Sequence, residues 1–163
     1  MKLQSADAQR TSHNPESTIS MFMGEYNHTL DEKGRLIIPS KFREGLGHEF
    51  VITKGMDGCL FGFPMDEWEN FEEKLKSLPM TNKEARQFVR FFLAGAADIE
   101  PDKSGRMLIP NNLREYAGIT REVVLIGVGG RIEIWSRENY DNSVSYSDLD
   151  EMSEHMFALG LEI

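Results

Sequence analysis

Two short segments of the chain carry residues whose types and spacing could bind a ligand. Each has an aspartate, a glycine three residues later and an arginine directly after the glycine: Asp31, Gly34 and Arg35 in the first, and Asp102, Gly105 and Arg106 in the second. An aspartate before a tight turn accepts hydrogen bonds from the turn's N–H groups and can pair with an arginine four residues on. An outward arginine restrained in this way can bridge phosphates or bind the O6 and N7 atoms of guanine bidentately.

Lysines lie in the same two turns, although not at equivalent positions. Lys33 directly precedes Gly34, whereas Lys103 directly follows Asp102. Their ammonium groups would act as point charges on phosphate. One isolated Asp–Arg turn is more often a surface ion pair without a partner. Two copies with the same three residue types favour a binding role for both turns.

The turns belong to a longer internal repeat. The fourteen residues from Asp31 to Glu44 match those from Asp102 to Glu115 at seven positions, and after a one-residue insertion Gly55 aligns with Gly127. Repetition of this extent indicates a duplicated structural unit. We therefore predict two tandem modules over residues 21–95 and 96–163. Residues 1–20 are polar and lack apolar periodicity, so we expect a flexible, dispensable leader there.

Each module is expected to contain two strands, a short helix, two more strands and then helices. Gly34 and Gly105 predict hairpin turns, followed by short strands at 36–38 and 107–109 that end at proline. Ser40 and Asn111 are predicted to cap the short helices, which end at glycine. Further strand pairs are expected at 49–54 with 59–63 and at 122–127 with 131–135. If Leu36 faces the core, alternation directs Arg35 outward.

Aromatic residues at helical spacing follow the strands. Trp68 and Phe71 begin one such pattern, and Phe88, Phe91 and Phe92 form another after Thr81. These residues are typical of a core or a subunit interface rather than of a cofactor site. Trp68, the three phenylalanines at 88, 91 and 92, and Phe157 amount to more apolar surface than one small module covers, which predicts self-association into a ring-like homo-oligomer.

The net charge of −9 argues against a nucleic-acid partner until its distribution is considered. Residues 31–54 carry five Lys or Arg against four Asp or Glu, and residues 102–131 carry five against three. Acidic residues dominate at 65–78, five against two, and at 136–163, seven against one. One surface could therefore meet a polyanion while another stays acidic, although the acidic segments are equally typical of solvated helix faces.

No pattern of catalytic or metal-binding residues is present. The four histidines, His13, His28, His48 and His155, show no ligand spacing, and no nucleotide-binding, serine-hydrolase or zinc-protease motif occurs. Asp31 and Asp102 could form a carboxylate pair, but the adjacent arginines would keep both ionised. Cys59 is the only cysteine, which is typical of a reducing cytoplasm. We expect no enzyme activity, no cofactor, no metal and no membrane span.

From Met21 onward, the sequence resembles the MraZ family, and each module resembles the AbrB-like swapped-hairpin fold. The residues that carry the resemblance are the opening Met-Phe-Met-Gly-Glu-Tyr, the duplicated turns and the acidic helical ends. The resemblance implies an α+β fold in which two pseudo-symmetric modules form a swapped-hairpin barrel. It also implies a cytoplasmic, nucleoid-associated transcriptional regulator. This regulator would form a ring and bind short G-rich direct repeats upstream of its own division and cell wall gene cluster. Arg35 and Arg106 would be its DNA-contacting arginines, supported by neighbouring basic residues. The alternative is an antitoxin-like or structural ring protein whose turns are only stabilising.

Overall fold

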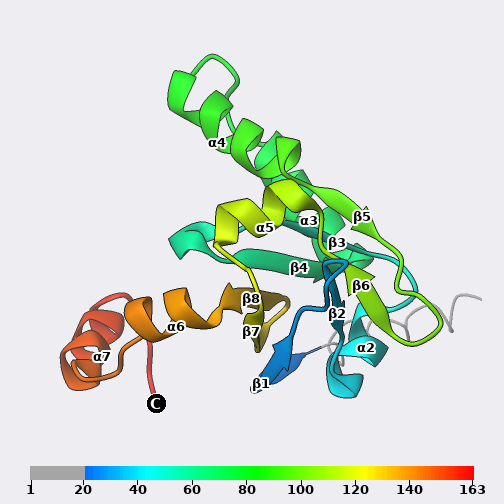
Figure 1. Ribbon diagram of the computed structural model, residues 1–163. Helices are drawn as coiled ribbons and strands as arrows, with labels where there is room; N and C mark the ends of the chain where they lie inside the picture. Colours follow the sequence, from blue (N-terminus) through cyan, green and yellow to red (C-terminus); the bar gives the residue numbers. More distant parts are fainter. Residues whose placement is uncertain (1–20) are drawn as a thin grey trace, which may run out of the picture.

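An antiparallel sheet of six strands forms the centre of the structure, a computed structural model that describes residues 21–163 (Figure 1). The strands lie in the order β1 (Phe22–Thr29), β7 (Glu122–Gly129), β8 (Ile132–Ser136), β4 (Leu60–Pro64), β3 (Phe50–Lys54) and β5 (Ala97–Ile99). A separate two-stranded antiparallel ribbon is made of β2 (Arg35–Ile37) and β6 (Arg106–Leu108). The leader predicted for residues 1–20 lies outside the described residues.

The two repeated halves of the chain interlock. Strand β1 pairs with β7, β5 pairs with β3, and β2 pairs with β6, so each of these pairs joins the first half to the second. Among the strands of residues 21–163, only β3 with β4 and β7 with β8 pair within one half. The predicted tight turns at Gly34 and Gly105 form, but the hairpin pairing expected around them is wrong beyond the turn. The strand after each turn has three residues, and it pairs with the equivalent strand of the other half instead of with the strand before its own turn.

Alternation along the strands creates two cores on opposite faces of the sheet. On β3, Ile52 contributes to the first core and Val51 to the second; on β7, Leu125 and Val124 divide in the same way. The first core also contains the inward residues of the ribbon, among them Leu36 and Met107, both fully buried. Burial of these inward side chains attaches the ribbon to the first core.

Helices cover both cores. The short helices α2 (Ser40–Leu46) and α5 (Asn111–Ala117) pack on the first core, whereas α3 (Met65–Lys76), α4 (Lys83–Ala94) and α6 (Arg137–Ser143) contribute to the second. A short 3-10 turn, η1 (Met56–Gly58), joins β3 to β4. The last helix, α7 (Leu149–Ala158), has no buried residue and lies apart from α4, at the lower left of Figure 1 where α4 is at the top. The predicted mixed α+β fold is confirmed.

Two details differ from the sequence predictions. Ser40 and Asn111 do not cap their helices, because Pro39 and Pro110 occupy the capping position and place these polar residues one step inside the helix. The predicted stop at Gly47 is confirmed. Phe92 and Trp68 are buried in the second core, so they add nothing to the exposed apolar surface.

No helix among residues 21–163 is long and apolar enough to cross a membrane.

Candidate nucleic-acid interface

The first turn is closed by hydrogen bonds to both the backbone and the side chain of Asp31. Its Oδ1 accepts hydrogen bonds from the backbone N–H groups of Lys33, at 2.9 Å, and Arg35, at 2.8 Å. Its Oδ2 accepts from Nε of Arg35 at 2.8 Å. Gly34 donates its N–H to the Asp31 carbonyl oxygen and has φ +83°, in the left-handed region that favours glycine. One carboxylate thus fixes both the turn and the base of the arginine side chain.

The second turn repeats this geometry. Oδ1 of Asp102 accepts from the N–H groups of Ser104 and Arg106, both at 2.9 Å, and Oδ2 accepts from Nε of Arg106 at 2.8 Å. Gly105 has φ +79°. Backbone hydrogen bonds to each carboxylate, principally from the arginine N–H, lower the pKa of Asp31 and of Asp102. Both aspartates therefore stay ionised beside their arginines at neutral pH.

The arginines are held at Nε and open at their ends. Within residues 21–163, no hydrogen bond engages the terminal nitrogens of Arg35 or Arg106. Their side chains keep 29% and 33% of their surface exposed. A guanidinium tethered at Nε retains its two terminal NH₂ groups for a planar acceptor pair such as the O6 and N7 atoms of guanine.

The ribbon brings the two arginines onto one surface. In the register of β2 with β6, Arg35 lies opposite Leu108 and Ile37 lies opposite Arg106. Residues directly opposite in an antiparallel pair project to the same face. Because Leu36 and Met107 are buried on the inner face, the four paired residues share the outer face.

A hollow of about 580 Å³ adjoins this outer face. Arg35, Arg106 and Lys33, predicted from the sequence, line it together with Arg121. Its acidic lining residues are Asp31 and Glu32, so basic residues outnumber acidic ones by four to two. Lys103 is exposed in the second turn but does not line this hollow. The fold therefore collects on one surface three of the four basic residues singled out in the sequence.

Sequence reasoning missed Arg121. No motif marks it, and its position depends on the contact between the two halves, in which the N–H of Leu30 donates to the Arg121 carbonyl oxygen at 2.7 Å. Other basic residues in the same segments are engaged elsewhere. The guanidinium of Arg131 lies 4.2 Å from the ring centroid of Phe61, and Nζ of Lys54 lies 5.4 Å from that of Phe91.

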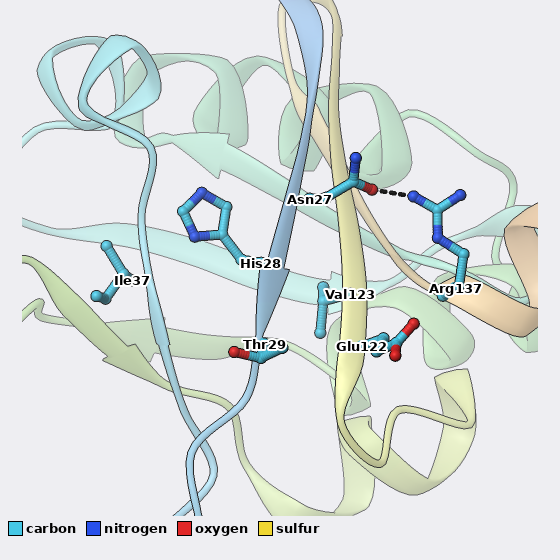
Figure 2. Close-up of a pocket in the computed structure, with 7 residues that line it drawn as sticks. All are labelled: Asn27, His28, Thr29, Ile37, Glu122, Val123 and Arg137. Atoms are coloured by element: carbon cyan, nitrogen blue, oxygen red, sulfur yellow. Dashed lines mark hydrogen bonds between the residues drawn. The ribbon is translucent and has the colours of Figure 1, made fainter.

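A second hollow, of about 470 Å³, also has Ile37 in its lining. Figure 2 shows Ile37 on its own segment beside His28, with Asn27 and Arg137 on the far side of β1, where Arg137 donates a hydrogen bond to Asn27. Ile37 lines both hollows. Among the described residues, no group of His, Cys, Asp and Glu side chains is arranged to hold a metal ion.

The duplicated turns and their place in the repeat agree with one family. A family model described as "MraZ protein, putative antitoxin-like" matches this chain twice, over residues 21–91 and 92–159. The chain belongs to the MraZ family. The resemblance found in the sequence is thereby confirmed.

Relatives in the family match most of this chain. It is 57% identical over 141 residues to the "Transcriptional regulator MraZ" of Lachnoclostridium phytofermentans, covering 86% of this chain and 99% of that protein. It is 62% identical over 122 residues to the protein of the same name from Carboxydothermus hydrogenoformans, covering 75% and 85%. The relative from Syntrophomonas wolfei is 54% identical over 143 residues, covering 86% and 100%.

Proposed function

We propose that this protein is a sequence-specific DNA-binding transcriptional regulator. It acts on short G-rich direct repeats upstream of the division and cell wall gene cluster, in the cytoplasm and associated with the nucleoid. The observation that carries the proposal is the pair of arginines, Arg35 and Arg106, each tethered at Nε and open at its terminal nitrogens on the outer face of one ribbon. Relatives named as transcriptional regulators support the same class of function.

The ribbon is suited to the major groove of DNA. That groove is about 12 Å wide and admits a two-stranded β-ribbon, and guanine presents O6 and N7 there to arginine. Arg35 and Arg106 read guanines in this scheme, while Lys33, Lys103 and Arg121 neutralise phosphates. Asp31, Gly34, Asp102 and Gly105 keep the arginines oriented before DNA arrives, which lowers the entropy lost on binding.

Affinity at physiological salt requires more than one chain. Lys33, Lys103 and Arg121 of one chain neutralise only about three phosphates, which is too few for tight binding at physiological salt. A ring-shaped homo-oligomer, built from AbrB-like modules over residues 21–95 and 96–163, presents several ribbons to successive repeats. Tethered contacts of this kind raise the overall affinity by orders of magnitude.

Helix α7 supports self-association. Leu149, Met152 and Met156 recur at intervals of three and four residues and are all exposed, so one side of a ten-residue helix is apolar and uncovered. A helix this short is marginal without a partner. Its acidic residues, such as Asp150, complement the exposed Arg86 and Arg90 of α4 on a neighbouring copy. Because α4 and α7 are two different surfaces of one chain, at the top and at the lower left of Figure 1, this contact would be head to tail, the kind that can close a ring.

The test of DNA binding is a gel shift with the region upstream of the protein's own gene, competed with unlabelled specific and scrambled duplexes. Retention against scrambled competitor is expected. Failure to shift this DNA and every other sequence would overturn the proposal in favour of the antitoxin-like or structural alternative.

The test of assembly is multi-angle light scattering at micromolar concentration. We expect a mass several times that of one chain, reduced by Met156→Glu on the apolar side of α7 and unchanged by Leu108→Glu, which introduces the same charge at an exposed apolar residue on the outer face of the ribbon. A monomeric mass for the unmodified protein would contradict the ring.

A further inference from the structure

The outer face of the ribbon alternates arginine with apolar side chains. Across the β2–β6 pair, Arg35 faces Leu108 and Ile37 faces Arg106, so each arginine has an apolar residue directly opposite. The arrangement is the same in both halves because the antiparallel pairing relates β2 to β6 by an approximate twofold axis. A surface that served only to bind phosphate would require the cations and not these two side chains.

Ile37 and Leu108 are exposed, at 49% and 56% of their surface, while the residues between and beside them on the inner face are buried. A single exposed apolar residue is ordinary on a protein surface and needs no explanation. Ile37 and Leu108, however, occupy equivalent positions in the two halves, each opposite an arginine, and so form a defined apolar surface. The adjoining hollow is lined by four basic residues, Lys33, Arg35, Arg106 and Arg121, and by two acidic residues, Asp31 and Glu32. This basic setting favours DNA, a polyanion, over an apolar protein surface.

We propose that Ile37 and Leu108 recognise the C5-methyl groups of thymines in the major groove, beside the guanines bound by Arg35 and Arg106. The thymine methyl is the distinctive apolar group that the bases present in this groove. Ile37 lines both hollows, so open space adjoins its side chain, whereas Leu108 lines neither and projects from the outer face. This inference rests on the proposed DNA-binding function and adds a second base to the recognised sequence.

The register limits where those thymines lie. Ile37 is two residues from Arg35 along β2, about 7 Å, and directly opposite Arg106, with their Cβ atoms about 5 Å apart. Stacked bases are about 3.4 Å apart along one strand. Each recognised thymine therefore lies within about two base steps of a guanine bound by arginine.

The experiment compares thymine with uracil, which lacks only the methyl group. Fluorescence anisotropy is measured on duplexes from the upstream region in which each thymine of a repeat is replaced by uracil in turn. For the unmodified protein, replacement of a contacted thymine is expected to weaken binding about fourfold, since one buried methyl contributes about as much as one CH₂. Thymines farther than two steps from the guanines should show no change.

Variants assign the methyl groups to the two side chains. Ile37→Ala should lose sensitivity to uracil at one thymine and Leu108→Ala at another, as a double-mutant cycle requires for residues in contact. Met56→Ala, which truncates an exposed apolar residue on η1, should keep the full sensitivity at both. Light scattering confirms that each variant has the unmodified assembly state.

The outcomes separate this inference from the proposed function. Tight binding with no loss on any uracil duplex overturns thymine recognition and leaves DNA binding intact. Uracil sensitivity that persists in both Ile37→Ala and Leu108→Ala likewise overturns it, because the methyl is then read by other residues. Failure of the unmodified protein to bind any duplex overturns the proposed function itself.

Discussion

The guanidinium of Arg114 lies where a side chain on Gly34 would begin: a Cβ added to Gly34 would be 2.8 Å from Nη1 of Arg114. The relationship is reciprocal, since a Cβ on Gly105 would be 2.5 Å from Cζ of Arg43. Each turn is thus braced by an arginine from a short helix of the other half. Glycine is required at these positions for its positive φ and also for the close approach of a cation.

Replacement of Gly34 by alanine should destabilise the protein by more than Gly118→Ala. Both glycines have positive φ, +83° and +68°, so both variants incur about 1–2 kcal/mol of left-handed strain. A Cβ at Gly118 would make only an ordinary contact, 3.4 Å from Nδ2 of Asn139, whereas the new methyl at Gly34 displaces Arg114. Urea unfolding of the two variants measures the difference.

Removal of Arg114 supplies the control for this comparison. In an Arg114→Ala background, Gly34→Ala should cost no more than Gly118→Ala, and the coupling between Gly34 and Arg114 should fall in the range of about 0.5–3 kcal/mol found for contacting residues. Additive effects of the two substitutions would show that the close approach has no energetic consequence.

Replacement of Arg35 or Arg106 by lysine should lower sequence specificity more than general DNA affinity. Lysine keeps the charge but loses both the planar pair of donors and the Nε hydrogen bond to Asp31 or Asp102. The expected cost is about 1–3 kcal/mol per contacted base. Binding to cognate and scrambled duplexes across a salt series measures it, once assembly of each variant is verified.

Lys33→Ala and Lys103→Ala are the matched variants for that series. They should weaken binding to all sequences alike and flatten the dependence on salt. An unchanged preference for cognate DNA in both arginine variants would mean that the arginines contact phosphate only.

The turn aspartates predict a dependence of stability on acid. The pKa values of Asp31 and Asp102 are lowered in the folded protein, mainly by the arginine N–H groups. Their contribution to the unfolding free energy is therefore complete above the pKa of an aspartate in the unfolded chain, about 3.9. It is lost as the pH falls through the lowered pKa values of the folded protein. The unfolding free energy of the protein relative to its Asp31→Asn, Asp102→Asn variant should shrink as the pH falls below about 4. A constant difference from pH 7 to pH 3 would contradict this.

Thr53 is expected to attach α4 to the sheet. It is fully buried on β3, and its Oγ1 donates to the Phe92 carbonyl oxygen at 2.7 Å, one of the last-turn carbonyls that lack a partner within the helix. Thr53→Val leaves this carbonyl unpaired and should cost about 1–3 kcal/mol. Thr53→Ser keeps the hydroxyl and should cost less; thermal unfolding that ranks serine below valine would contradict the role.

The local features of this protein were determined by the sequence alone. Asp31 and Gly34 predict a turn because their hydrogen bonds span only five residues, and the alternation of Leu36 with Ile37 predicts which side of β2 is buried, as the structure confirms. The repeat and the family were likewise visible in the order of residues. The roles assigned to Arg35 and Arg106 in DNA recognition stay predictions.

Only the tertiary structure decided which strands pair and which cations gather. Arg35 shares a surface with Arg106, seventy-one positions away in the sequence, because β2 pairs with β6 instead of continuing its own hairpin. Arg121, Arg114 and Arg43 reach the turns only through this exchange between halves. A strand of three residues has no local preference strong enough to choose its partner. Burial of Leu36, Ile38, Met107 and Ile109 in one shared core makes that choice, and it depends on the whole fold.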